Sequence, residues 1–259
     1  MQLIETKIEG AVGTICLDYF EKRNALSKVL VEAILEGLDA FAAERVRVVV
    51  LRARPGVKIW SAGHDVDELP EGRRDPLGWY DPLRRLIRGI ETHPAPIIAM
   101  IEGGVWGGAC EAAVACDINI VAENATFALT PAKLGVPYNV SGMLTFLNSA
   151  PLRVIKEMAF TARPIDAKRA LAAGLINHVV PVENLEAFTY GMAADIVANA
   201  PLSISVMKEE LRILADAHPM SPEGFERVQG LRRIVYDSAD YVEGLKAFKE
   251  RRKPAYRGE

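Results

Sequence analysis

The chain has few cysteines and histidines, and what it has is not arranged as a disulfide framework or a metal site. It holds three cysteines among 259 residues. The count is odd and Cys16 and Cys110 stand in apolar runs, so we expect buried, reduced thiols together with Cys116. The histidines stand far apart in sequence, without the spacing of metal ligands, so we predict no metal site. They are His64, His93, His178 and His218.

The chain also lacks an excess of charge of one sign and a long uninterrupted hydrophobic run. With 34 acidic and 31 basic residues the net charge is −3, which gives no general nucleic-acid surface. The longest apolar stretch, 96–122, is interrupted by Glu102, Glu111 and Asp117, so no membrane-spanning helix is expected. The first residues show no signal-peptide pattern. We therefore expect a cytoplasmic protein with no nucleic-acid and no membrane partner.

Half of the residues are hydrophobic, and their pattern predicts alternating strands and helices. Residues 2–8 and 12–18 alternate apolar and polar side chains, as in a β-hairpin. Further strands are expected at 46–51, 96–101 and 118–121, and helices at 28–44, 80–93 and about 108–116. After about residue 140 the strand signal nearly disappears. Helices are expected there at 140–149, 151–160, 166–173, 183–199, 201–216, 221–235 and 238–250.

Two glycine-rich turns, at 61–65 and 103–108, each follow a strand-like apolar run. Two backbone N–H groups that converge from such turns form an oxyanion hole, which stabilises negative charge on a carbonyl oxygen. The alternative is that both are tight packing turns. The second turn is no phosphate-binding loop, because Ala109 and Cys110 stand where lysine and serine or threonine are needed. A triad of Ser61, His64 and Asp65 is not expected from residues so close in sequence.

Five segments, in this order along nearly the whole chain, resemble the crotonase (enoyl-CoA hydratase/isomerase) superfamily. They are KRNALS at 22–27, WSAGHD at 60–65, GVWGGACE at 104–111, TARPIDA to AGLI at 161–176, and EGLKAFKERRKP at 243–254. The resemblance implies an α/β fold with a crotonase-like spiral of β/α turns, a ββα superhelix, over residues 1–195. It implies a helical C-terminal region over 196–259 for trimerisation and completion of the CoA site. Acyl-CoA thioesters, enolate intermediates and a homotrimer or dimer of trimers are implied as well.

The resemblance also assigns site residues. The backbone N–H groups of His64 and Gly108 match the oxyanion hole of the family. Arg251, in a basic C-terminal stretch, is assigned to the CoA phosphates; alternatively, the stretch is a solvated helix end whose cations complement the helix dipole. The remaining residues assigned to substrate or CoA contacts are Lys22, Ala25, Ala62, Gly63, Asp65, Val66 and Thr130.

The reaction depends on a departure from the family pattern. Glu111 matches the first of the two glutamates with which hydratases of the family move protons. Thr130 and Pro131 stand where the second, preceded by proline, is expected. Because neither is an efficient base near neutral pH, hydration is not expected. Loss of CO₂ from a malonyl-type thioester needs fewer acid–base residues. The protein must orient the C–CO₂ bond and stabilise the enolate oxygen.

The segment 135–139, with Tyr138, resembles decarboxylating members of the superfamily. The resemblance implies conversion of methylmalonyl-CoA to propionyl-CoA and CO₂ without metal, biotin or pyridoxal phosphate. Tyr138 is then expected to bind the departing carboxylate, with help from Thr130 and the His64 side chain. Tyr138 as a packed aromatic residue and Glu111 as a structural carboxylate remain alternatives. For the whole chain, the alternatives are enoyl-CoA isomerisation or hydration through Glu111 and a catalytically silent acyl-CoA-binding protein.

Overall fold

Two β-sheets form the centre of the computed structural model, which describes residues 3–70, 78–217 and 219–258. The larger sheet has the order β1-β2-β3-β5-β7-β10, antiparallel between β1 and β2 and parallel elsewhere. Its strands are Ile4–Glu9, Val12–Leu17, Val48–Ala53, Ile97–Ile101, Ile118–Ala122 and His178–Val180. The predicted hairpin and strands are confirmed, whereas β10 was not expected. Gln2, in the predicted hairpin, and His218 lie outside the described residues.

A second, smaller sheet has the order β4-β6-β8-β9. Its strands are Ile59–Ser61, Gly104–Trp106, Thr126–Ala128 and Ile165–Asp166. The chain passes from β3 to β4, from β5 to β6 and from β7 to β8, so each of these passages starts in the large sheet and ends in the small one. These repeated passages are the turns of the predicted spiral. The small sheet is not predictable from the sequence, because strands of two or three residues show no periodicity.

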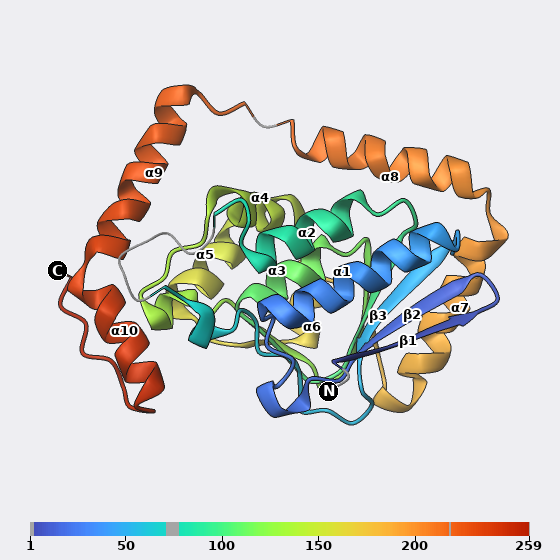
Figure 1. The fold of residues 1–259 in the computed structure, drawn as a ribbon, viewed down its shortest axis with the longest axis horizontal. Coiled ribbons are helices and arrows are strands. Elements are labelled where there is room, and N and C mark those ends of the chain that lie inside the picture. Colours follow the sequence, from blue (N-terminus) through green and yellow to red (C-terminus); the bar gives the residue numbers. More distant parts are fainter. Residues whose placement is uncertain (1–2, 71–77, 218, 259) are drawn as a thin grey trace.

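Helices cover both faces of the large sheet (Figure 1). Alternation along β3 separates two cores: Val49 and Leu51 belong to the larger cluster with α1 and α2, and Val48 and Val50 to the cluster with α7. Side-chain oxygens cap four of these helices, including Ser27 on α1 and Asp81 on α2. The helices are α1 Lys28–Ala43, α2 Pro82–Thr92, α3 Gly108–Ala115, α4 Val140–Ser149, α5 Leu152–Thr161, α6 Ala167–Ala172 and α7 Leu185–Ala198.

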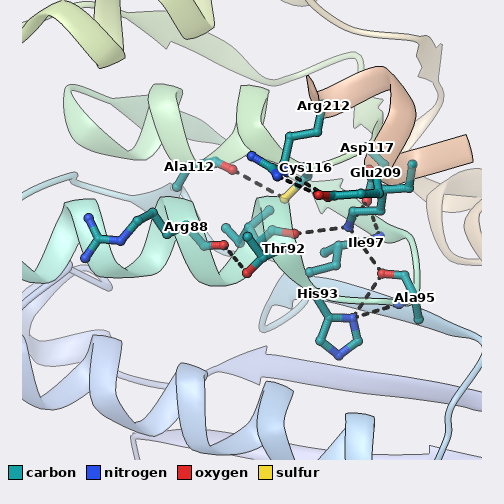
Figure 2. A network of polar contacts seen from close by, with 12 residues as sticks. Arg88, Thr92, His93, Ala95, Ile97, Ala112, Cys116, Asp117, Glu209 and Arg212 are labelled. Atoms are coloured by element: carbon teal, nitrogen blue, oxygen red, sulfur yellow. Dashed lines mark hydrogen bonds and ion pairs between the residues drawn. The ribbon is translucent and has the colours of Figure 1, made fainter. Parts of the chain in front are cut away.

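The C-terminal part is helical, as predicted, and its first two helices lie on the outside of the molecule (Figure 1). These helices are α8 Pro201–Ala215, α9 Pro222–Asp237 and α10 Ala239–Lys249. α8 is tied to the core where Lys208 forms an ion pair of 2.7 Å with Asp117. Asp117 also accepts a hydrogen bond from the Ile97 N–H (Figure 2). None of the described helices is long and apolar enough to cross a membrane.

α10 returns to the core and packs near the first glycine turn. Tyr241 and Leu245 of α10 form a small cluster with Leu69 and Val136. α10 also contacts a short 3₁₀ helix, η3 (Pro131–Leu134). Because α7 runs to Ala198, the predicted boundary at 195/196 falls inside a helix that packs on the large sheet. The division into two regions stays a prediction.

Candidate active site

The two glycine-rich turns meet in space. The second predicted turn, 103–108, contains the short strand β6, and only 107–108 follow it. β4 and β6 pair in parallel, so the segments after their carboxyl ends, 62–65 and 107–108, emerge at the same sheet edge. Gly63 has φ +86°, and a Cβ there would lie 2.3 Å from the Trp106 carbonyl oxygen and 2.9 Å from the Gly108 nitrogen. A Cβ on Gly108 would lie 3.4 Å from the His64 nitrogen. Only a residue without a side chain lets the turns approach this closely.

The N–H groups of His64 and Gly108 are both free among the hydrogen bonds of the described residues. Gly108 is the first residue of α3, where backbone N–H groups have no partner within the helix. By contrast, the neighbouring Gly107 N–H donates to the Ala128 carbonyl at 2.8 Å. Two neighbouring free donors, of which Gly108 lies at a helix N-terminus, are the arrangement that holds a developing oxyanion.

A cavity of about 720 Å³ opens beside these donors. Its wall includes most of the residues that the sequence assigned to the substrate. These are Lys22, Ala25, Ala62, His64, Asp65, Val66, Gly108, Thr130 and Tyr138. α10 contributes Gly244 and Phe248, and the segment after it contributes Arg252 and Lys253. Gly63, Glu111 and Arg251 are not among the described residues that line the cavity.

The His64 ring is held at both nitrogens. Nδ1 lies 3.0 Å from the Asp65 carbonyl oxygen, and Nε2 lies 2.9 Å from Oδ2 of Asp81, the N-cap of α2. Burial lowers the pKa of His64, but the hydrogen bond and charge of Asp81 outweigh it, and the net result is a raised pKa. The ring is therefore biased toward its protonated form, beside the donor that its own backbone supplies.

The Tyr138 hydroxyl donates a hydrogen bond of 2.8 Å to the Gly107 carbonyl oxygen. Its ring packs edge-on against Phe146, with 5.4 Å between ring centroids. Burial raises the pKa of Tyr138 well above its usual value, so the hydroxyl keeps its proton. In this arrangement that proton points at the peptide that carries the Gly108 N–H, rather than into the cavity.

Thr130 lies next to the second glycine turn. Its Oγ1 is 2.9 Å from the position of a Cβ on Gly107, and its side chain caps no helix. Thr130 and Pro131 both line the cavity. The place where the sequence lacks a second glutamate is therefore part of the cavity wall, next to the donors.

Glu111 lies deeper in the protein, on α3, and is 1% exposed. It forms an ion pair and hydrogen bond with Arg84 of α2. Burial raises the pKa of Glu111 to about 7, although the charge of Arg84 opposes this. This environment fits the alternative of a structural carboxylate.

Three residues at the start of α2 contact the site and were not predicted from the sequence. Asp81 holds His64, Leu83 faces Gly108, and Arg84 holds Glu111. Asp81 followed by Pro82 is a typical helix start and marks the element. Nothing local indicates which turn this helix faces. Within the part of the chain that the structure describes, no three His, Cys, Asp or Glu side chains group as metal ligands.

The fold, the paired turns and the cavity define an acyl-CoA enzyme of the crotonase type. Residues 7–259 match the enoyl-CoA hydratase/isomerase family, and the chain belongs to that family. It is 51% identical to methylmalonyl-CoA decarboxylase of Escherichia coli (strain K12), over 99% of this chain and 98% of that protein. It is 31% identical to human mitochondrial methylglutaconyl-CoA hydratase, over 92% of this chain and 71% of that one.

Solved structures agree with this relationship. A methylmalonyl-CoA decarboxylase in complex with 2-nitronate-propionyl-CoA superimposes with a TM-score of 0.98 at 49% identity, covering 100% of this chain and 99% of that one. A methylmalonyl-CoA decarboxylase complexed with 2S-carboxypropyl CoA gives the same TM-score, identity and coverage. The predicted family and crotonase-like fold are confirmed.

Proposed function

We propose that the protein decarboxylates methylmalonyl-CoA to propionyl-CoA and CO₂ through a thioester enolate. The observation that carries this proposal is a pair of free N–H donors, from His64 and Gly108, in a cavity whose wall has Thr130 and Pro131 in place of a second glutamate. The 51% identity to methylmalonyl-CoA decarboxylase over nearly both full lengths supports the same reaction.

The chemistry follows from the donors. The bond between the α-carbon and the carboxylate breaks, its electron pair enters the thioester carbonyl, and CO₂ leaves. The oxygen of the resulting enolate becomes negative and is stabilised by the two N–H groups. One such donor is worth about 3 kcal/mol or more of barrier, so a pair supplies a large share of the rate enhancement. Because backbone donors hold the charge, we propose that no metal, biotin or pyridoxal phosphate is required.

The α-carbon must then take up a proton. Both ring nitrogens of His64 face other acceptors, and the Tyr138 proton is directed at Gly107. Glu111 is paired with Arg84 behind the cavity wall. Because these side chains are all engaged elsewhere, we propose water as the proton donor.

We propose that CoA lies along the cavity from the donors toward α10. Cationic side chains at the wall suit its phosphates; they include Lys22, Lys133, Arg252 and Lys253. Lys22 is already paired with Asp67 at 2.5 Å, and Arg252 with Glu250 at 2.6 Å and with Glu243. Lys253, by contrast, has no ion pair among the described residues. Arg251, which the sequence assigned to the phosphates, lies next to it in sequence.

We further propose a homotrimer or a dimer of trimers in the cytoplasm. α8 and α9 present large apolar side chains to solvent, which monomeric proteins rarely gather in one place. Leu202 is 81% exposed, Leu214 70% and Ile234 68%. The three cysteines are unpaired thiols, which is the usual state in a reducing compartment.

The test is a substrate panel with purified protein and a chelator present. Malonyl-, methylmalonyl-, ethylmalonyl- and crotonyl-CoA are supplied separately, and products are separated by chromatography. Propionyl-CoA from methylmalonyl-CoA is the expected result. Rapid hydration of crotonyl-CoA without release of propionyl-CoA would overturn the proposal, and binding without turnover of any thioester would make the protein a carrier.

A further inference from the structure

The first turn of α2 contacts both halves of the oxyanion hole. Oδ2 of Asp81 lies 2.9 Å from Nε2 of His64, on one half. Two residues later, Cδ2 of Leu83 lies 2.7 Å from the position of a Cβ on Gly108, on the other half. Asp81 is fixed in turn, because its Oδ1 accepts the N–H of Leu83 at 2.9 Å. One helix end therefore lies against both residues whose backbones supply the donors.

The contacts of the His64 ring favour its protonated form. The carbonyl oxygen of Asp65 and the carboxylate of Asp81 both accept hydrogen bonds, and neither can donate one while Asp81 is ionised. A neutral imidazole has a single N–H and satisfies only one of them, whereas an imidazolium satisfies both. With 13% of the His64 side chain and 4% of the Asp81 side chain exposed, water replaces neither contact readily.

Other charged groups around the ring leave Asp81 as its direct partner. Glu68, of the 3₁₀ helix η2 (Val66–Glu68), acts on the ring through its charge and raises its pKa, while its carboxylate accepts the Lys28 N–H. Asp65 has its own cation, Lys22, at 3.5 Å. On α2, Arg84 is occupied by Glu111. The described neighbours thus provide one carboxylate in hydrogen-bond contact with the ring.

We propose that Asp81 is a positioning residue of the active site, which holds His64 as an imidazolium and so keeps the His64 N–H aligned with the Gly108 N–H. The proposal rests on the proposed function, because it concerns the donors of that reaction. When His64 loses its proton, one of the two ring contacts is lost, and the first glycine turn loses its tie to α2. Turnover therefore requires a protonated His64 ring, although the chemical step does not consume that proton.

Asp81→Asn tests this with little disturbance of the helix start, because an asparagine side chain caps helices as well as aspartate. The His64 pKa is measured by NMR from the imidazole signals, and kcat/KM for methylmalonyl-CoA is measured across pH. In the unmodified enzyme kcat/KM should fall as pH rises through the His64 pKa. In Asp81→Asn both the NMR pKa and this limb should move to lower pH together, by about 1–3 units. His64→Gln should abolish the limb.

Asp166→Asn is the matched control, because Asp166 caps α6 with an exposed side chain and contacts no histidine. It should leave both readouts unchanged. An unmoved His64 pKa in Asp81→Asn, or a moved pKa with an unmoved activity limb, overturns the proposal. If Asp81→Asn does not fold, the unmodified enzyme still provides a test. A difference between the NMR pKa of His64 and the pH midpoint at which kcat/KM falls overturns the proposal. NMR needs no turnover, so absence of decarboxylation refutes the proposed function separately.

Discussion

The Tyr138 hydroxyl is hydrogen-bonded to the carbonyl of Gly107, at 2.8 Å, and that carbonyl belongs to the same peptide group as the Gly108 N–H. A hydrogen bond received at the carbonyl fixes the plane of the peptide and polarises its N–H. Tyr138 thus contacts one half of the proposed oxyanion hole from behind, and Asp81 contacts the other half through the His64 ring.

Tyr138→Phe should keep the ring packing on Phe146 and remove only this hydrogen bond. We expect kcat for decarboxylation to fall by about 10- to 100-fold, because the Gly108 N–H loses its alignment. The free energy of unfolding should fall by about 1 kcal/mol. Tyr190→Phe, which removes a hydroxyl 2.8 Å from Thr14 on the far face of the sheet, is the control. An unchanged kcat would leave Tyr138 as a packing residue.

Gly108→Ala should block the oxyanion hole while the fold survives. The new methyl group would stand 3.4 Å from the His64 nitrogen, where the enolate oxygen belongs, and its closest obstacle is the movable end of Leu83 at 2.7 Å. We expect kcat to fall by about 100- to 1,000-fold with a small change in melting temperature. Gly191→Ala, in α7 with open space around it, should leave kcat unchanged and raise the melting temperature slightly, because alanine favours the helix. Normal turnover in Gly108→Ala would place the enolate elsewhere.

Glu111→Gln should alter stability more than decarboxylation. Burial raises the pKa of Glu111 to about 7 from 4.5, so its stabilising contribution is complete below about pH 4.5 and is lost as pH rises to about 7. Relative to the variant, the unmodified protein should lose stability on the order of 3 kcal/mol over that range, measured by denaturant unfolding. Glu186→Gln, which removes a carboxylate that is 63% exposed and paired with the largely buried Arg52, is the comparison. Complete loss of decarboxylation would make Glu111 catalytic.

Lys253→Ala should raise the KM for the CoA thioester by about tenfold, the equivalent of one lost charge-assisted contact. Lys253 lines the cavity, whereas Arg251 does not. KM should also rise with salt in the unmodified enzyme and rise less in the variant, because ions screen this attraction. Arg251→Ala is the comparison, because the resemblance to the family assigns Arg251 to the CoA phosphates. A larger effect there than in Lys253→Ala would restore the assignment of the phosphates to Arg251.

Leu211→Glu combined with Leu214→Glu should separate the proposed trimer into smaller species. Both side chains lie on α8 and are more than 65% exposed, at 67% and 70%. Charges buried at a subunit interface without partners would destabilise it strongly. Light scattering coupled to size-exclusion chromatography gives the mass. Leu171→Glu, at a residue of α6 that is 40% exposed, serves as the control. A monomeric mass for the unmodified protein would refute the proposed assembly.

The sequence by itself determined the features that depend on local chemistry. Glycine at 63, which has φ +86°, marks a turn that no side chain tolerates. Ser27 and Asp81 start helices because their side chains cap free N–H groups. Proline at 131 cannot transfer a proton, which already turned the prediction from hydration toward decarboxylation. Family and fold class were predicted from five segments that resemble the crotonase superfamily, and the reaction from that resemblance together with Pro131; all three agree with the relatives found.

Only the tertiary structure decided which partners these residues meet. Tyr138 donates to Gly107, His64 faces Asp81, and Glu111 pairs with Arg84, across separations of 31, 17 and 27 residues. Periodicity and capping report on neighbours within a turn or two, so they carry no information about such contacts. The small sheet shows the same limit: three residues of β4 and three of β6 give no pattern, yet their parallel pairing brings the two turns together. The donors come from local sequence, and their alignment comes from packing.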